Sequence, residues 1–213
     1  MDDAEFDRAM IAAAFQLAGE QGWRAVNVAA AARAAGLSLA RARERFPGRL
    51  AILLRLGRLA DQAALAEQPS DGPARDRLFD LLMRRIDVFQ AHRAGVLALL
   101  RALPAEPATA LLLALATRRS MRWMLEAAGF SAVRVRGELR VKGLVAVWLW
   151  TMRAWQADAS EDLSATMAAL DAALNRAERA AAFLGWRAKP VEPPSGGSES
   201  GSGSIEPEPD PAA

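Results

Sequence analysis

Arginine side chains cluster in one short segment of the sequence, and guanidinium groups are well suited to bind a nucleic acid. Residues 24–58 contain eight arginines and one acidic residue, Glu44. Arg41 and Arg45 are four residues apart, so a helix would place both on one face, with Arg43 to the side. Guanidinium groups pair with phosphate or bind guanine through two parallel hydrogen bonds. Arginine is the common basic residue throughout the chain, so the clustering, rather than the residue type, predicts contact with double-stranded DNA.

The sequence offers little for catalysis or metal binding. It contains no cysteine and a single histidine, His92, which excludes disulfides and thiolate metal sites. It has no glycine-rich phosphate loop and no spacing typical of a metal site, so we expect no enzymatic activity, no cofactor and no metal. The acidic residues within 158–162 are interpreted as loop and helix N-terminal charges. His92 is interpreted as a helix cap or surface residue, with titration or ligand orientation as the alternative role.

Bulk composition predicts a globular chain followed by a disordered tail. Apolar residues make up 52% of the 213 residues and charged residues 24%, which is enough for a substantial core. The first residues are acidic, unlike a secretory signal, and the apolar run 144–152 is too short to cross a bilayer. Residues 190–213 are rich in proline, glycine, serine and acidic residues. We therefore expect a soluble cytoplasmic protein with a disordered acidic tail over 190–213.

Helix-forming residues dominate the chain, and glycine or proline punctuates them at intervals. Alternation with a period of two is rare, so the sequence predicts an all-α fold. The loop around residues 68–73 divides a head from a body. We expect a head over 1–47, a connecting helix over 48–67 and a body over 72–187. The individual helices are expected at about residues 4–20, 27–34, 38–46, 49–66, 74–91, 94–103, 108–128, 137–156 and 160–183.

Two of the expected helices form a helix-turn-helix pattern. The helices over 27–34 and 38–46 are short, Gly36 lies in the turn between them, and Ser38 begins the second. Here residues 6–58 resemble the head of the TetR family of transcriptional regulators. The matching motifs are Gly22-Trp23, Asn27-Val28, Ala35-Gly36-Leu37-Ser38, Phe46-Pro47-Gly48-Arg49 and Ile52-Leu53.

This resemblance implies a TetR-like fold, with a three-helix head and a helical body of about six helices. It also implies a homodimeric, ligand-responsive repressor. The second helix of its helix-turn-helix, over 38–46, would enter the major groove of an operator. The residues at the family's DNA-contacting positions are Asn27, Ser38, Leu39, Ala40, Arg41, Arg43, Arg45 and Arg49. Ala29 departs from the family pattern, which commonly has a basic residue there, and Glu44 would face phosphate unfavourably. The alternative is a vestigial head whose arginines are only solvated.

The expected helix over 137–156 is apolar on nearly every side, so it should be buried on two sides. One side can face the core and the other a second subunit, together with the apolar seam of helix 160–183. The alternative is a single-chain core without dimerisation. The predicted dimer interface consists of Trp150, Trp155, Leu163, Met167, Leu170 and Leu174.

Bulky, adaptable side chains in the body could enclose an apolar effector, or they could be ordinary core residues. The predicted pocket consists of Phe89, Met121, Trp123, Met124, Trp148 and Met152.

The body is also similar to a second family, the ubiquinone-biosynthesis lipid-binding proteins that share the TetR fold. The matching segments are 75–78, 92–93, 104–107, 123–129, 155–162 and 166–171. This resemblance implies an isoprenoid lipid as ligand and an amphipathic C-terminal helix for contact with a membrane surface. Residues 180–189 could make that contact, although the segment is short, and docking on the body is the alternative. The family's aromatic-rich stretch is missing at 131–134. The alternative function is thus a lipid-binding accessory protein of ubiquinone biosynthesis that does not bind specific DNA.

Overall fold

A computed structural model describes residues 1–67, 72–132 and 134–183 of the chain. These residues form α-helices and two short 3-10 turns, with no strand among them, so the expected all-α architecture is confirmed. The helices are α1 (Asp3–Gln21), α2 (Val28–Ala34), α3 (Leu39–Arg45), α4 (Arg49–Leu65), α5 (Ala74–Gln90), α6 (Arg93–Ala102), α7 (Pro107–Ala127), α8 (Arg134–Ala157) and α9 (Ser164–Phe183). The expected tail over 190–213 and the end of the expected body lie outside the described residues.

Most helix boundaries fall close to the expected positions, and α9 shows the largest difference. It begins at Ser164 rather than near residue 160. The Asp158 carboxylate accepts hydrogen bonds from the backbone N–H groups of Ser160, at 3.0 Å, and Thr166, at 2.8 Å. The Ser160 and Thr166 hydroxyls donate to the same carboxylate. These bonds hold the chain in a loop. The hydroxyl groups most of all, and then the backbone N–H groups, lower the pKa of Asp158 well below its usual range because they favour the ionised carboxylate. The acidic residue before α9 is therefore a structural cap.

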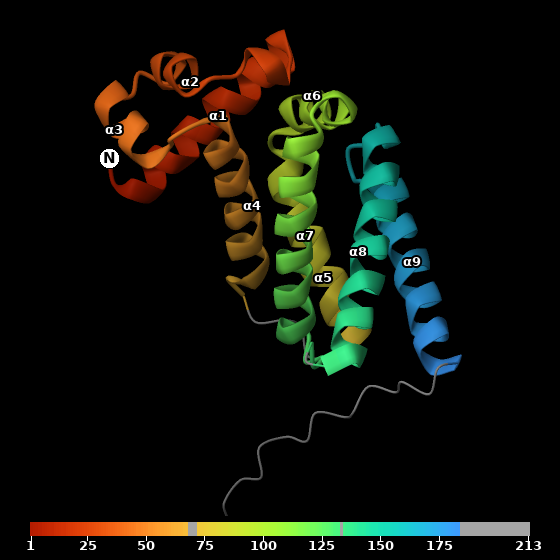
Figure 1. Cartoon of the computed structure of the whole chain (residues 1–213). Coiled ribbons are helices and arrows are strands. Elements are labelled where there is room, and N and C mark those ends of the chain that lie inside the picture. Colours follow the sequence, from red (N-terminus) through yellow and green to blue (C-terminus); the bar gives the residue numbers. More distant parts are fainter. Residues whose placement is uncertain (68–71, 133, 184–213) are drawn as a thin grey trace, which may run out of the picture.

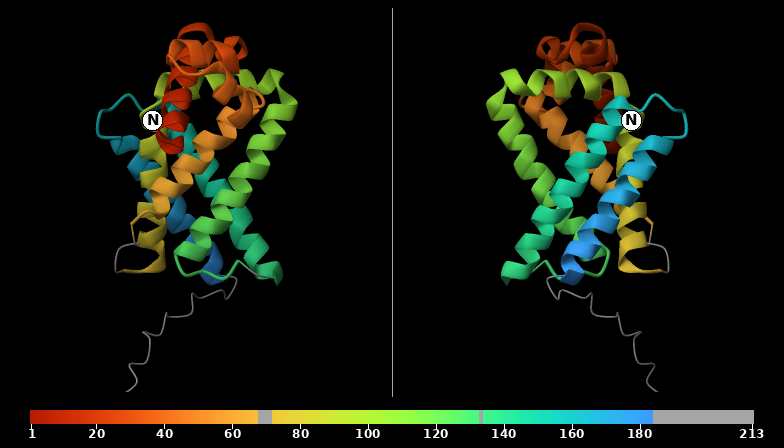
Figure 2. Two further views of the ribbon diagram at one scale, coloured as in Figure 1. Left: turned by 90° about the vertical axis from the view of Figure 1, so that its left-hand side faces the viewer. Right: turned by 90° about the vertical axis from the view of Figure 1, so that its right-hand side faces the viewer.

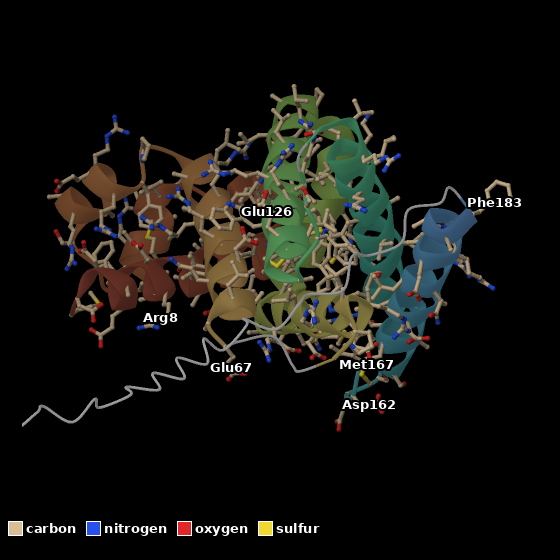
Figure 3. All side chains as sticks on the ribbon, turned by 90° about the horizontal axis from the view of Figure 1, so that it is seen from below. Arg8, Glu67, Glu126, Asp162, Met167 and Phe183 are labelled. Atoms are coloured by element: carbon tan, nitrogen blue, oxygen red, sulfur yellow. The ribbon has the colours of Figure 1, made fainter. Side chains whose placement is uncertain are left out.

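The helices form a small head beside a larger body. Figure 1 shows α1, α2 and α3 on one side, with α4, α5, α7, α8 and α9 running along the body. Helix α6 lies across one end of the body helices, beneath the head (Figures 1 and 2). Figure 3 labels Asp162, just before α9, and Phe183, the last residue of α9, at opposite ends of that helix. Among the described residues, no helix alone has the length and apolarity to cross a bilayer, although the sharply bent pair 93–105 and 107–127 meets those criteria jointly.

The head is joined to the body by a close crossing of α1 and α6. Gly95 of α6 lies directly against the Phe15 carbonyl of α1, where a side chain would have no room. The His92 ring, at the start of α6, lies 5.9 Å from the Phe15 ring. His92 occupies the N-cap position of α6, as one of the expected roles had it, but its side chain is half-buried and makes no capping hydrogen bond. Burial lowers the pKa of His92, because it penalises the charged ring.

Helix α4 connects the two halves by packing on both. Its buried apolar residues recur every three or four positions, from Ile52 and Leu53 near the head to Ala60 and Ala64 in the body. This spacing places them on one face of the helix. Any change in the direction of α4 would therefore move the head relative to the body.

The α1–α6 crossing can be tested with two helical glycines. Gly95→Ala would place a methyl group against the Phe15 carbonyl, and we expect the free energy of unfolding to fall by about 1–3 kcal/mol. Gly57→Ala is the control, because no atom lies within 4 Å of a methyl group there. Its higher helix propensity should raise stability by about 0.5–1 kcal/mol. Urea unfolding measures both, and equal effects would contradict the close crossing.

Candidate nucleic-acid interface

Helices α2 and α3 form the helix-turn-helix unit that the sequence predicts. The Asn27 side chain accepts a hydrogen bond from the Ala30 backbone N–H at 2.8 Å and so caps α2. The Ser38 hydroxyl accepts one from the Arg41 backbone N–H at 3.4 Å and caps α3. Gly36, between the helices, has a φ of 63°, a conformation that glycine adopts without strain. The turn therefore depends on its glycine.

The two faces of α3 differ in burial. Ala42 is fully buried on the inner face, and Phe46, just after the helix, is 1% exposed. On the outer face Leu39 is 47% exposed, and Ala40 and Arg43 are also exposed. The outer face can thus reach a partner while the inner face anchors the helix.

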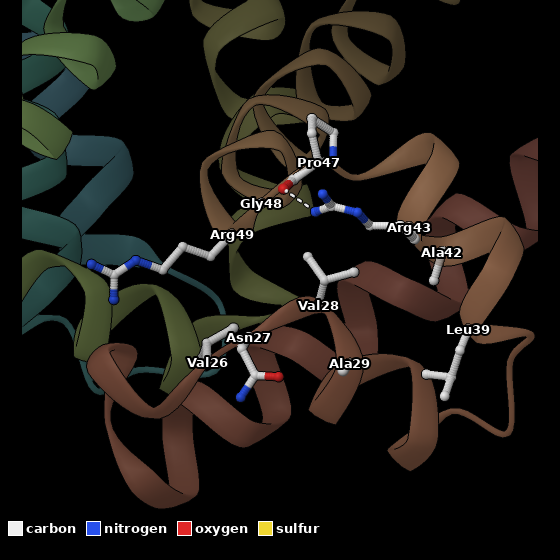
Figure 4. Close-up of a pocket in the computed structure, with 10 residues that line it drawn as sticks. All are labelled: Val26, Asn27, Val28, Ala29, Leu39, Ala42, Arg43, Pro47, Gly48 and Arg49. Carbon is white, nitrogen blue, oxygen red and sulfur yellow. Dashed lines mark hydrogen bonds between the residues drawn. The ribbon is translucent and has the colours of Figure 1, made fainter.

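A hollow of about 480 Å³, the head hollow, lies between α2, α3 and the start of α4. Its lining residues are Val26, Asn27, Val28, Ala29, Leu39, Ala42, Arg43, Pro47, Gly48 and Arg49. Figure 4 shows the Arg43 side chain turned toward Pro47, whose carbonyl accepts its hydrogen bond at 3.2 Å. Gly48 provides no side-chain cap for α4, so the first N–H groups of that 17-residue helix face this region without a side-chain acceptor. Such a helix start, beside arginine, favours a phosphate.

Two arginines of α3 are bound to the start of α1 instead of facing outward. The Asp3 carboxylate pairs with both Arg41 and Arg45, and the Arg41 guanidinium lies 4.5 Å from the centre of the Phe6 ring. These hydrogen bonds lower the pKa of Asp3, because they favour its ionised form. The α1 carboxylate therefore neutralises positive charge that the sequence assigned to DNA.

Asp7 extends this charge cluster into the interior. Its carboxylate, 4% exposed, accepts hydrogen bonds from Arg45 at 2.9 and 3.0 Å. Arg55 of α4 pairs with the same carboxylate at 3.0 Å. Arg45 consequently joins α3 to α1 through its Nε and both Nη groups, and its contact with phosphate stays a prediction. The sequence analysis missed Asp3 and Asp7, and the acidic residues at the start of the chain were the available signal.

Arg49 has a partner in the body. Its side chain pairs with Glu106, just before α7, at 3.0 Å, and Arg24 lies 3.9 Å from the same carboxylate. In Figure 4 the Arg49 side chain extends away from Arg43. Of the predicted DNA-contacting residues, the structure brings Asn27, Leu39, Arg43 and Arg49 together at the head hollow.

The predicted pocket residues fall into two groups. Met121, Met124, Trp148 and Met152 are buried in the body, and the Phe89 and Trp148 rings meet edge-on at 5.9 Å. Trp123 is 54% exposed on α7, so its assignment to an enclosed pocket is corrected. The sequence analysis missed Arg85, a buried cation beside Phe89 and Trp148.

The predicted dimer residues also divide. Trp150 is 52% exposed and Met167 is partly exposed, so both are accessible to a partner. The assignment of the remaining four to a dimer interface is corrected, because they pack in the core of the single chain; these residues are Trp155, Leu163, Leu170 and Leu174. Leu170 and Leu174, four positions apart, mark the inner face of α9.

Solved structures with the same fold are regulators. No protein-family model matches this sequence, and no curated protein sequence matches it significantly. A TetR transcriptional regulator from Nitrosomonas europaea is 23% identical with a TM-score of 0.67, and the match covers 82% of this chain and 99% of that chain. A TetR-family regulator from Streptomyces coelicolor is 23% identical with a TM-score of 0.56, covering 86% of this chain and 85% of that one. A TetR-family regulator from a Rhodococcus species is 20% identical with a TM-score of 0.57, covering 81% and 98%.

The chain therefore has the TetR-type fold, as the first resemblance implies. The second resemblance, to the ubiquinone-biosynthesis family, is not supported by these neighbours and remains a prediction from the sequence.

The structural role of Arg45 predicts a loss of stability when it is removed. Arg45→Ala leaves Asp7 buried with Arg55 as its remaining partner, so we expect the melting temperature to fall by several degrees. Arg43→Ala is the control; its side chain is exposed, and its effect should stay below about 0.5 kcal/mol.

The pH dependence gives a second readout of the same variant. Because the pKa of Asp3 is lowered in the fold, its ion pairs stabilise the protein above the unfolded pKa and are lost as pH falls through the folded value. The deficit of Arg45→Ala should therefore shrink in acid. Equal melting temperatures for Arg45→Ala and Arg43→Ala at neutral pH would contradict the stabilising role of the Arg45 ion pairs.

Proposed function

We propose that this protein is a homodimeric transcriptional repressor that binds operator DNA through its head and responds to an apolar small molecule in its body. The observation that carries the proposal is the outward face of α3, where Leu39, Ala40 and Arg43 are exposed next to the head hollow. A short helix of this kind, carried by a helix-turn-helix unit, fits the major groove of DNA.

The charge distribution supports contact with DNA through few but well-placed groups. Arg43 is exposed on α3, so its guanidinium can turn from the Pro47 carbonyl to a base or phosphate. The start of α4 and Arg49 lie across the hollow, where they can receive a backbone phosphate once Arg49 leaves Glu106. Arg41 and Arg45 contribute indirectly, because their ion pairs to α1 fix the orientation of α3.

The body supports a response to an effector because α4 is common to both halves. Phe89, Trp148 and the buried methionines Met121, Met124 and Met152 provide adaptable apolar surface for a ligand. A ligand that favours one position of α4 over another changes the spacing of the two heads. That differential affinity is what regulation of DNA binding requires.

DNA binding is tested with Arg43→Ala and a matched control. Operator sites are first selected from genomic DNA with the purified full chain, and affinity is then measured by fluorescence anisotropy. We expect Arg43→Ala to weaken binding roughly tenfold or more, through loss of a base or phosphate contact. Wild-type affinity should also fall steeply between about 50 and 200 mM salt, because phosphate contacts release counterions.

Arg119→Ala on α7 is the control, since Arg119 is exposed and lies outside both the head and the proposed α8–α9 pairing. Its affinity should equal that of the wild type. Absence of a selected site at low salt, or equal affinities for Arg43→Ala and Arg119→Ala, would remove support for DNA binding by α3.

An exposed apolar stripe on α8 supports the homodimer. Gly143, Ala146 and Trp150 follow one another at spacings of three and four, and all three are exposed. Nothing lies within 4 Å of where a Gly143 side chain would begin, so a second helix can approach closely there. The Trp150 ring lies 5.3 Å from the Arg176 guanidinium of α9, so the stripe borders α9. A two-fold pairing of α8 and α9 would cover this stripe in both subunits.

The interface is tested by placing a charge on each of two exposed tryptophans. Trp150→Glu should convert the dimer to a monomer, because the interface would bury an unpaired carboxylate. Trp123→Glu changes a similarly exposed residue on α7 and should leave the dimer intact. Sedimentation velocity gives the mass of each. A monomeric wild type, or a dimeric Trp150→Glu variant, would rule out this pairing.

A further inference from the structure

A buried cation lies in the body where the sequence predicts only apolar side chains. Arg85 of α5 is 3% exposed. Its guanidinium lies 5.4 Å from the centre of the Phe89 ring and 5.1 Å from that of the Trp148 ring. A buried arginine requires compensating interactions, because burial removes the guanidinium from water. These two rings supply part of that compensation through cation–π contact.

The ionic partner of Arg85 comes from the helix that links head and body. One carboxylate oxygen of Asp61, on α4, pairs with an Nη group of Arg85. The other oxygen accepts a hydrogen bond from the Ser120 hydroxyl of α7 at 2.7 Å. A single charged cluster therefore holds α4, α5 and α7 together inside the body.

The cluster leaves hydrogen-bonding capacity unused. Within the described part of the chain, the Arg85 Nε–H is buried and donates no hydrogen bond. Burial lowers the pKa of Arg85 to about 10, so the group is still a cation at neutral pH. A buried donor without an acceptor is costly, and an incoming anion would satisfy it.

We propose that Arg85 binds the carboxylate of an apolar acid, which is the effector of this protein, with the acid's hydrocarbon part lying against Phe89 and Trp148. This inference rests on the proposed regulatory function. A planar carboxylate matches the guanidinium fork and can accept from Nε and an Nη group together. The aromatic rings favour an apolar body for the ligand. A doubly charged phosphate would add a second negative charge next to Asp61 and is disfavoured.

The position of Asp61 links this site to the head. The acid's carboxylate competes with Asp61 for the same guanidinium, so binding weakens the contact that holds α4 on α5. The same α4 begins at Arg49, beside the head hollow. Occupation of the site therefore releases α4 and lowers the affinity for DNA.

The site is tested without DNA, by titrating the full chain with acids and with neutral compounds of the same size. The probes are octanoate with 1-octanol and phenylacetate with 2-phenylethanol, and binding is measured by calorimetry and thermal shift. We expect at least one acid to bind roughly tenfold or more tighter than its matched alcohol, through its charge-assisted hydrogen bonds. If neither acid binds more tightly than its alcohol, the proposal is overturned.

Variants of the cluster identify the binding residue. Arg85→Met should abolish acid binding. Arg84→Met, one residue earlier, removes an arginine that pairs with Glu67 at 3.2 Å and should bind the acid as the wild type does. Because Arg85→Met leaves the partly buried Asp61 without its cation, the double variant Asp61→Asn with Arg85→Met removes both charges and keeps an acceptor for Ser120. Unchanged acid binding by the double variant would overturn the assignment to Arg85.

The single variant Asp61→Asn tests whether the Asp61 carboxylate competes with the acid for Arg85. This variant keeps Arg85 and removes the competing carboxylate, so acid binding should strengthen. Weaker acid binding in Asp61→Asn would overturn the competition between ligand and α4. Acid binding is measured in the absence of DNA. A failed operator selection would therefore overturn the proposed regulatory function without affecting the result on the acid site.

Discussion

A carboxylate buried inside the head must be neutralised, and this requirement fixes how the helices of the head are arranged. Asp7 of α1 is almost inaccessible to water, and it is paired with Arg45 of α3 and Arg55 of α4. An unpaired charge there would destabilise the fold by more free energy than a surface ion pair contributes. Three helices from different parts of the chain are therefore held in one arrangement. The burial of Ala42, on the inner face of α3, and of Phe46, just after it, stabilises that arrangement further.

The same ion pairs decide what remains for a partner. Because Arg41 and Arg45 face α1, the exposed positions of α3 include Leu39, Ala40 and Arg43. The proposed DNA interface consequently combines the exposed Arg43 guanidinium with apolar contact and the start of α4, rather than a dense row of cations. Such an interface would gain less from non-specific attraction to phosphate and would rely more on the fit of α3 in a groove.

Helix α4 carries charged contacts to both halves of the molecule. Arg55 pairs with the head through Asp7, and Asp61 pairs with the body through Arg85. A shift of the head relative to the body therefore acts on these contacts as well as on the α1–α6 crossing. The contact in the head stabilises the helix-turn-helix unit, whereas the contact in the body lies beside aromatic rings and an unused donor. The proposed regulation through the body would thus leave the proposed DNA-binding surface itself intact.

The sequence alone determined the helices and the helix-turn-helix turn, because apolar spacing, caps such as Asn27 and glycines such as Gly36 act over a few neighbouring residues. The TetR-type fold was implied by the resemblance of the head to that family. Only the tertiary structure decided which arginines remain free and which apolar faces lie inside. Arg45 and Asp7 are 38 positions apart, and Arg85 and Asp61 belong to different helices. Periodicity shows that a residue such as Leu170 is apolar on one face of α9, but not whether that face meets its own core or a second subunit. Those outcomes depend on how helices pack in space, which no local pattern encodes.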